Sequence, residues 1–388
     1  MIMTMKRMMI MAVAVAAAMC CAGSCGRKTE TPAEGSRIGF ALSFFKAVNS
    51  SVPGGENVVA SPYSAGVALS MLTEGADDQT KVEFDNALNG CLFVSESLSD
   101  NDTVVVKSAN SIWISDNFSV RNRYVAHMEK DFNAAVEVMD FADPSTVHAM
   151  NNWCSENTEG KIAKIKDSLS PNDVMVLADA LYFNAPWENA FDPGLTHDAV
   201  FHGLNKDTDV RMMYRNGMYD YIEYQGCQII RLPYAGGRYS MYVALPPAGM
   251  SPGSVLPYVG ESMFKMALGM LRPAEVKFYM PKVKLETSMN LNKTLERMGV
   301  RTAFTAAADF DGISASGPLV LNEVAQKCYI DITEQGTEAA AVTTATIALT
   351  SLRPAADQKV MKVDRPYIFF IADMENENIL FTGTISNL

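Results

Sequence analysis

An uncharged run near the C-terminus most constrains how this chain can fold. Residues 339–352 read AAAVTTATIALTSL, and these fourteen residues include no charge, glycine or proline. Residues 338–341 favour a helix, whereas the β-branched residues of 342–347 favour a strand. At a period of two, the run presents a face of small or apolar residues, which is typical of a strand that can enter a crowded sheet. Left exposed, the run would promote aggregation. We therefore expect the fold either to protect the run or to give it a function.

The chain is long and apolar enough to form a large folded core. It has 388 residues, of which 48% are hydrophobic. Its net charge of -12 argues against nucleic acid or anionic lipid as a partner, because both need a basic surface. The densest basic run of the mature chain, residues 160–168 (GKIAKIKDS), interleaves its lysines with apolar residues. We interpret this run as a solvated face, with a polyanion contact as the alternative.

The first residues form a targeting segment. Lys6 and Arg7 precede an apolar run at residues 8–19 that is too short to cross a bilayer. Residues 22–25 (AGSC) resemble the lipobox of bacterial lipoproteins, in which a peptidase cuts before a diacylated cysteine. We therefore predict three parts: a lipoprotein signal peptide at residues 1–24, a lipidated Cys25 with a polar tether at residues 25–36, and a folded domain at residues 37–388.

Four further cysteines are spread along the mature chain without a C-x-x-C pair: Cys91, Cys154, Cys227 and Cys328. This spacing defines neither a zinc site nor a redox motif. We interpret the four residues as buried small hydrophobic side chains, and disulfide formation in an exported protein is the alternative. No metal site and no cofactor are predicted.

Helix-like patterns come first along the chain, and strand-like patterns dominate later. Residues 38–51 space Phe and Leu as a helix does, and Ser61 with Pro62 marks the start of a second helix. Residues 367–385 combine two strand-like runs around a polar turn, which predicts a hairpin. Because no linker or repeat divides the chain, we expect one α+β domain with large antiparallel sheets.

One enzyme motif occurs, but its chemistry argues against a hydrolase. Residues 249–253 (GMSPG) match the G-x-S-x-G nucleophile elbow, with Ser251 as the candidate nucleophile. In that elbow the residue after the serine donates its backbone N–H to the oxyanion, and Pro252 has no N–H to donate. A proline-rich turn fits the segment better. The four histidines of the chain show no zinc-binding spacing.

The uncharged run belongs to a longer segment that resembles the reactive-loop hinge of the serpins. The segment reads EQGTEAAAVT, and its matching residues are Glu334, Gly336, Thr337, Glu338, Ala339, Ala340 and Ala341. Further matching segments lie at residues 57–76, 151–162, 178–191, 280–300, 308–314 and 364–387. The resemblance covers essentially the whole mature chain.

The resemblance implies the serpin fold, a single α+β domain of three β-sheets and eight or nine helices with an exposed reactive loop. It also implies a suicide-substrate inhibitor of serine proteases, with cysteine proteases as a second class of target, and not an enzyme. A protease would cut the loop and form an acyl-enzyme, and the cut loop would then enter the central sheet as a new strand. Thr337 and Ala339 are small enough to enter. A non-inhibitory serpin-fold binding or interaction protein is the alternative.

By the same resemblance, five residues belong to the machinery that opens the sheet: Ser61, Ser64, Asp179, Trp187 and Gln326. Trp187 falls where the loop first enters. Asp179 stands where the family usually has asparagine, and Gln326 stands where it usually has histidine. A glutamine can donate a hydrogen bond to a carboxylate, so Asp179 and Gln326 can form a hydrogen bond with each other. The sequence leaves open how strong the cluster is and how it depends on pH. Ordinary buried polar groups are the alternative.

The spacing in the family places the reactive bond sixteen residues after the hinge glutamate, between Thr350 and Ser351. A small residue before the cut favours an elastase-like protease, whose specificity pocket is small. Cuts after Leu349 or Leu352 would suit chymotrypsin-like enzymes, and a cut after Arg353 would suit trypsin-like ones. We expect a monomer, anchored through lipid to a bacterial outer membrane and either periplasmic or exposed at the cell surface.

Overall fold

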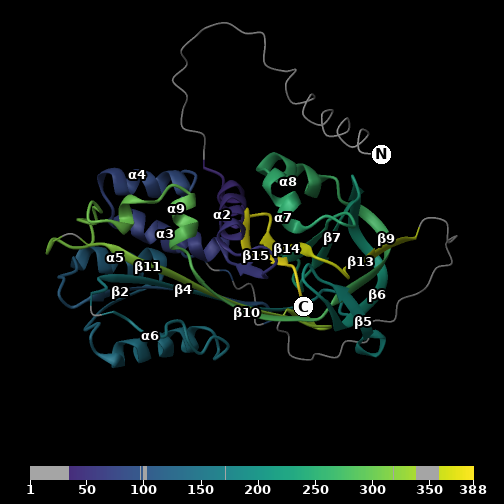
Figure 1. Ribbon diagram of the computed structural model, residues 1–388, viewed down its shortest axis with the longest axis horizontal. Coiled ribbons are helices and arrows are strands. Elements are labelled where there is room, and N and C mark those ends of the chain that lie inside the picture. Colours follow the sequence, from purple (N-terminus) through teal and green to yellow (C-terminus); the bar gives the residue numbers. More distant parts are fainter. Residues whose placement is uncertain (1–34, 97, 99–102, 171, 318, 338–357) are drawn as a thin grey trace, which may run out of the picture. The chain divides into compact units, whose positions relative to one another are not determined.

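The computed structural model describes residues 35–388, apart from residues 97, 99–102, 171, 318 and 338–357. In this part of the chain, helices lie against the faces of two sheets (Figure 1). The α-helices are α2 (Arg37–Ser51), α3 (Pro62–Gly75), α4 (Asp78–Ala87), α5 (Asn122–Phe132), α6 (Pro144–Asn157), α7 (Pro252–Val255), α8 (Glu261–Gly269) and α9 (Asn292–Arg297). Among the described residues, no helix combines the length and apolar composition that crossing a membrane needs.

The first sheet has six strands in the order β10-β11-β12-β4-β2-β3. Their bounds are β2 (Val105–Ser115), β3 (Ala135–Met139), β4 (Met175–Pro186), β10 (Val283–Asn290), β11 (Leu321–Ile332) and β12 (Gly336–Thr337). The described residues of β12, Gly336 and Thr337, lie between two long strands, β11 and β4. This sheet contains the site described below.

The second sheet has nine strands, in the order β1-β15-β14-β8-β7-β6-β9-β13 with β5 paired to β6. Their bounds are β1 (Val58–Ala60), β5 (His197–His202), β6 (Asp207–Tyr224), β7 (Cys227–Pro233), β8 (Ser240–Leu245), β9 (Arg272–Pro281), β13 (Lys359–Lys362), β14 (Tyr367–Asp373) and β15 (Asn378–Ile385). The 18-residue strand β6 pairs with β5, β7 and β9. It therefore joins two groups of strands into one hydrogen-bonded sheet. The described strands thus form two sheets, whereas the resemblance implied three.

Local signals in the sequence account for several of these elements. Ser61 caps α3, because its hydroxyl accepts a hydrogen bond from the backbone N–H of Ser64, and Pro62 occupies the first turn. β14 and β15 form the predicted hairpin, with Tyr367 opposite Ile385. The expectation of antiparallel sheets was incomplete, because β4 with β11, β2 with β3, and β9 with β13 pair in parallel. Each of these pairs joins strands that are separated by a long intervening segment.

The six-stranded sheet carries helices on both faces. α3 packs against β2 and β4 on one face and contributes to the main core. α6 packs on the opposite face, as Figure 1 shows, over a smaller core that includes Trp113, Ala178 and Ala180. The two alanines are small residues directly under a helix, so this face of the sheet is tightly covered.

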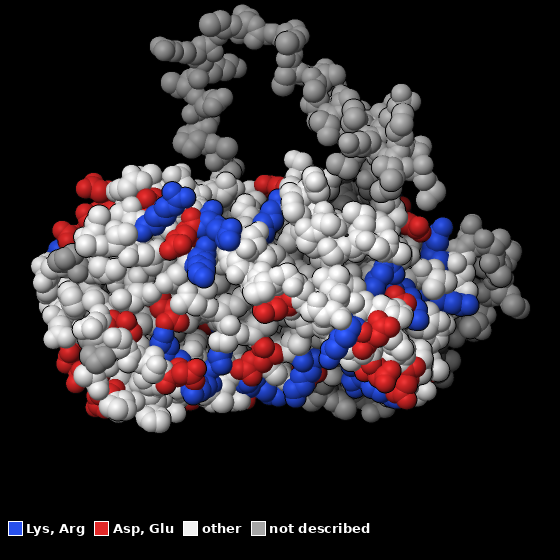
Figure 2. Space-filling model, in the orientation of Figure 1, with Lys and Arg blue, Asp and Glu red and all other residues white. Residues whose placement is uncertain are grey.

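Charged residues of both signs are interspersed over the face of the molecule in Figure 2. The lysine-rich run at residues 160–168 takes part in ion pairs. Lys164 pairs with Asp167, and Lys166 pairs with Glu323 of β11. The Lys166 side chain is only 15% exposed. The interpretation of this run as a solvated face was therefore wrong for Lys166, because its aliphatic stem and charge are used to fix the segment after α6 to the sheet.

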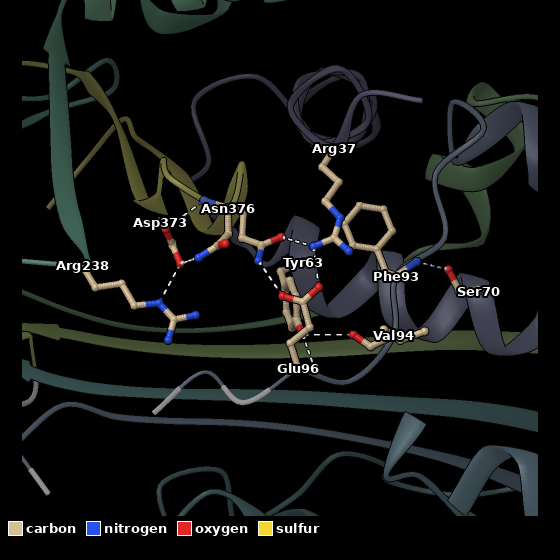
Figure 3. A network of polar contacts seen from close by, with 10 residues as sticks. Arg37, Tyr63, Ser70, Phe93, Val94, Glu96, Arg238, Asp373 and Asn376 are labelled. Carbon is tan, nitrogen blue, oxygen red and sulfur yellow. Dashed lines mark hydrogen bonds and ion pairs between the residues drawn. The ribbon is translucent and has the colours of Figure 1, made fainter. Parts of the chain in front are cut away.

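A polar network fixes the segment that leads from α4 to β2 (Figure 3). Arg37 Nη1 lies 2.8 Å from Glu96 Oε1 and donates to Asn378 Oδ1 at 2.9 Å. The backbone N–H of Glu96 donates to the Tyr63 hydroxyl at 3.3 Å. Nearby, Arg238 Nε lies 2.7 Å from Asp373 Oδ2. The network thus connects α2, α3 and the β14–β15 hairpin.

Candidate functional site

The predicted hinge begins as a short strand inside the six-stranded sheet. β12 pairs antiparallel with β4, where Thr337 lies opposite Ala185 and Gly336 lies opposite Pro186. On the other side, Thr337 lies opposite Ile332 of β11. The side chain of Thr337 is 2% exposed. The first residues of the hinge therefore already occupy a position between β4 and β11.

Beyond this point, β4 and β11 pair directly with each other. Their parallel register runs from Met175 opposite Leu321 to Leu181 opposite Cys328. A longer strand can follow β12 only if these two strands separate. Such a strand would form antiparallel ladders on both sides, and an antiparallel ladder is slightly more stable per residue than the parallel one it would replace.

Gly336 is required by the close approach of two backbones. A Cβ atom at this position would lie 2.2 Å from the carbonyl oxygen of Ala185 and 2.6 Å from Cα of Pro186. Both are backbone atoms that cannot move aside as a flexible side chain can. The resemblance placed a glycine at this position of the hinge, and the structure gives a steric reason for it.

Glu334 holds the base of the hinge in place. Its carboxylate accepts hydrogen bonds from Thr196 Oγ1 at 2.9 Å and from Lys282 Nζ at 2.7 Å. Burial raises the pKa of Glu334, but these donors and the positive charge of Lys282 outweigh it, so the pKa lies below its ordinary value. The backbone carbonyl of Glu334 also accepts from the N–H of Phe191 at 2.8 Å.

Trp187 contacts the hinge turn through both its backbone and its side chain. Its indole Nε1 donates to the carbonyl of Thr333 at 3.0 Å, and its backbone N–H donates to the carbonyl of Gln335 at 2.9 Å. Its ring stacks on Tyr234, with centroids 4.5 Å apart. Trp187 thus lies at the base of the hinge, and its role at the entry of the loop stays a prediction.

Sequence reasoning missed Tyr234. This wholly buried side chain follows β7, and its hydroxyl lies 2.6 Å from Oγ1 of Thr337. The surrounding letters, LPYAGG, are those of an ordinary turn and give no signal of this contact. Tyr234 belongs to the site because it contacts Thr337 and stacks on Trp187, and both residues are distant from it in the chain.

The structure brings Ser61, Ser64, Asp179 and Gln326 together in one buried cluster. Asp179 on β4 and Gln326 on β11 are opposite each other in the parallel register. Gln326 Nε2 donates to Asp179 Oδ2 at 2.8 Å and to the carbonyl of Ser61 at 3.0 Å. Gln326 Oε1 accepts from the N–H of Ser61 at 3.0 Å, and the Ser64 hydroxyl donates to Asp179. Trp187 lies apart from this cluster, at the hinge.

Asp179 is the most unusual member of the cluster. Its side chain is fully buried, and burial raises its pKa from 3.8 to about 7, although the hydrogen bond from Gln326 acts in the opposite direction. The cluster connects the N-terminus of α3 to the two strands that would have to separate. Its members are therefore placed to affect how readily those strands part.

Several predicted residues lie outside the described part of the chain. These are Cys25, Glu338, Ala339, Ala340, Ala341, Leu349, Thr350, Ser351, Leu352 and Arg353. Lipidation and the position of the reactive bond therefore remain predictions.

The remaining candidate residues are the four cysteines and Ser251. Cys91, Cys154, Cys227 and Cys328 are free thiols, and burial raises the pKa of Cys154 to about 12 and that of Cys227 to about 11. Cys154 and Cys328 are buried as expected, whereas Cys91 and Cys227 are only partly buried. Ser251 caps α7, where its hydroxyl accepts from the N–H of Ser254. Within the described ranges, no cluster of three or more His, Cys, Asp or Glu residues is placed to hold a metal ion.

Comparison with known proteins identifies the family. The model of the family described as Serpin (serine protease inhibitor) matches residues 36–388, and this chain belongs to the serpin family. An uncharacterized serpin-like protein of Thermococcus kodakarensis is 32% identical over 353 residues, which cover 85% of this chain and 80% of that protein. The leukocyte elastase inhibitor of Sus scrofa is 31% identical over 371 residues, which cover 90% and 97% of the two chains.

Solved structures agree with this assignment. The crystal structure of the thermophilic serpin Tengpin in its native state is similar with a TM-score of 0.83 and 29% identity, over 94% of this chain and 96% of that one. Thyroxine-binding globulin in complex with thyroxine is similar with a TM-score of 0.79 at 24% identity, over 90% and 98%, and shows the shared fold alone. The predicted serpin fold is thus confirmed. Membership of the family supports a protease-inhibitor function in general and not an enzyme.

Proposed function

We propose that this protein is a suicide-substrate inhibitor of serine proteases that traps its target by inserting the cleaved loop between β4 and β11. The observation that carries the proposal is the place of β12, since Thr337 already pairs with both strands and Gly336 pairs with β4. About a dozen further ladder residues, at about 0.5–1.5 kcal/mol per hydrogen bond, would release on the order of 10 kcal/mol. That free energy is sufficient to drive a large displacement of an attached protease.

We further propose an elastase-like protease as the target, with the reactive bond between Thr350 and Ser351. A small residue before the cut fits a small specificity pocket. The name of the Sus scrofa relative, a leukocyte elastase inhibitor, supports the same class of target. Neighbouring cuts after Leu349, Leu352 or Arg353 would direct the inhibitor to chymotrypsin-like or trypsin-like enzymes.

The test uses residues 26–388, which lack the predicted lipid anchor, incubated separately with elastase-like, chymotrypsin-like and trypsin-like proteases. We expect an SDS-stable covalent complex with the elastase-like enzyme, and mass spectrometry of the released C-terminal peptide will locate the cut. Cleavage without a complex and without loss of protease activity contradicts the proposal and favours the non-inhibitory alternative.

We also propose that Cys25 carries a lipid that anchors the protein to a bacterial outer membrane. The apolar run followed by AGSC supports this proposal. Metabolic labelling with a radioactive fatty acid, comparing the full chain with Cys25→Ala, tests it. Equal labelling of both proteins contradicts it.

A further inference from the structure

We propose that Asp179 is a proton-controlled latch on the six-stranded sheet: when its carboxyl group is neutral the sheet stays closed, and its ionisation favours separation of β4 from β11. The inference concerns the closed sheet itself. It rests on the proposed function only in assigning a use to the separation, namely admission of the cleaved loop.

The position of Asp179 couples its contacts to the opening of the sheet. Asp179 lies within the parallel ladder of β4 and β11, directly opposite Gln326. One carboxyl oxygen accepts from Gln326 Nε2 on the neighbouring strand, and the other accepts from the Ser64 hydroxyl on α3. Separation of the two strands must break the contact with Gln326, so the free energy of that contact enters directly into the free energy of opening.

The surroundings of Asp179 supply polar groups but no opposite charge among the described residues. The groups that face Asp179 are the hydroxyl of Ser64 on α3, the amides of Gln326 on β11 and Asn110 on β2, and the thiol of Cys328 on β11. The thiol of Cys154 on α6 interacts with it electrostatically from the opposite face of the sheet. The thiols are the titratable groups among them, and burial raises the pKa of both, so they stay neutral. Among the described residues, no cation perturbs the pKa of Asp179. An ionised carboxylate here therefore relies on the hydrogen bonds from Gln326 and Ser64, without an opposite charge among the described residues, which is costly in a buried site.

An unsatisfied hydrogen-bond acceptor lies beside the carboxyl group of Asp179. Asn110 lies directly opposite Asp179 on the other neighbouring strand, so both side chains are on the same face of the sheet. Asn110 is 3% exposed, and its Oδ1 has no hydrogen-bond partner among the described residues. A neutral carboxyl group carries a proton that it can donate, whereas a carboxylate can only accept. The neutral form thus suits this surrounding better than the ionised form.

The direction of the pH effect follows from these contacts. In the closed sheet the pKa of Asp179 is about 7, and in an opened sheet that admits water it falls toward its ordinary value of 3.8. Opening therefore releases a proton between these two values. The equilibrium constant for opening rises by up to about tenfold per pH unit in that window and levels off above it.

Hydrogen exchange measures this opening without any protease. Exchange of the backbone amides in the β4–β11 ladder is followed from pH 4.5 to 8.5 and corrected for intrinsic exchange. For the wild-type protein we expect opening to increase by at least about tenfold between pH 5 and pH 7 and then to level off. Asp179→Asn, which cannot ionise, should show a flat profile. Glu323→Gln is the matched control, since it makes the same chemical change on β11 at the ion pair with Lys166, and it should keep the wild-type profile.

Infrared spectroscopy of the wild-type protein gives a second measurement that needs no variant to fold. We expect the absorption of a buried protonated carboxyl group at pH 5 and its loss by pH 8.5. A flat exchange profile in the wild-type protein, or the absence of this band at pH 5, overturns the latch. If exchange follows the expected profile but no protease is trapped at any pH, the proposed function is wrong and the latch stands. If proteases are trapped but the exchange profile is flat, the latch is wrong and the proposed function stands.

Discussion

The hydroxyl oxygens of Thr337 and Tyr234 lie 2.6 Å apart in a fully buried contact, so the start of the short strand β12 is tied to the body of the protein. Tyr234 in turn stacks on Trp187 at a centroid distance of 4.5 Å. Thr337 is therefore packed beside this aromatic pair, with Ala185 and Ile332 opposite it on the two neighbouring strands. A side chain that replaces that of Thr337 must therefore fit into the same volume between β4 and β11.

The first prediction concerns Thr337→Arg. Burial of an unpaired charge costs several kcal/mol, so the arginine should keep the hinge out of the sheet. We expect the yield of SDS-stable protease complex to fall at least about tenfold while cleavage of the loop continues. Thr337→Val, which has nearly the same size and lacks the hydroxyl, should reduce the yield by less than about threefold. Equal yields for the arginine and valine variants would contradict insertion at this position.

The second prediction concerns Gly336→Ala. The added Cβ would lie 2.2 Å from the Ala185 carbonyl oxygen, so the backbone of β12 must move away from β4. We expect a loss of about 1–3 kcal/mol in the free energy of unfolding, together with a change in tryptophan fluorescence, because Trp187 contacts this turn. Gly269→Ala in α8 is the control, since a Cβ there meets no atom within 4 Å. A loss of stability no larger than that of the control would show that β12 tolerates a side chain.

Much of this site could be predicted from sequence, because its residues occur in motifs that are continuous in the chain. The hinge residues Glu334 and Gly336 are an example, and so is the Ser61 cap of α3. Tyr234 and Asn110 could not be found in this way. Their roles depend on which residue lies opposite or beside them after folding, and the sequence around them carries no sign of those neighbours.

The fold, too, could be predicted from sequence where it depends on neighbouring residues and not where it depends on distant ones. The 367–385 hairpin depends on residues close together in the chain, and the sequence indicated it correctly. The parallel pairing of β4 with β11 joins residues about 150 positions apart, as at Asp179 and Gln326. No local pattern encodes such a pairing, because it depends on the connections and on the core between the strands.

The third prediction concerns the ion pair of Arg238 and Asp373 (Figure 3). The Asp373 side chain is 0% exposed, and Arg238 and Asn376 donate hydrogen bonds to it. Arg238→Met leaves this buried carboxylate with a smaller set of donors. We expect a loss of about 2–4 kcal/mol in the free energy of unfolding, measured by chemical denaturation.

Arg272→Met is the control for this variant. Arg272 is exposed and donates to the backbone carbonyls of Gly269 and Leu271, so its loss should cost less than about 1 kcal/mol. Adding Asp373→Asn to Arg238→Met removes the uncompensated charge and should recover part of the loss. A double variant less stable than Arg238→Met would contradict this account.

The last prediction is a stability optimum on the acid side of neutrality, set by two carboxyl groups of opposite behaviour. Glu83 on α4 accepts hydrogen bonds from the N–H groups of Arg301 and Thr302 at 2.7 and 2.8 Å. Burial opposes its ionisation, but these donors outweigh burial and lower its pKa from 4.5 to about 2. Its contribution is therefore present above pH 4.5 and is lost as the pH falls toward 2.

Asp179 behaves in the opposite way. Its pKa is raised from 3.8 to about 7 in the folded protein, so its contribution is present below 3.8 and is lost as the pH rises to 7. Together the two groups place the highest thermal stability near about pH 4–5. Thermal unfolding at a fixed scan rate from pH 2 to 8.5 checks this. Glu83→Gln should flatten the acid side of the curve, and Asp179→Asn should flatten the side between pH 4 and 7. A wild-type optimum above pH 7 would contradict the assignment of Asp179, because a neutral carboxyl group stabilises the closed sheet only below that value.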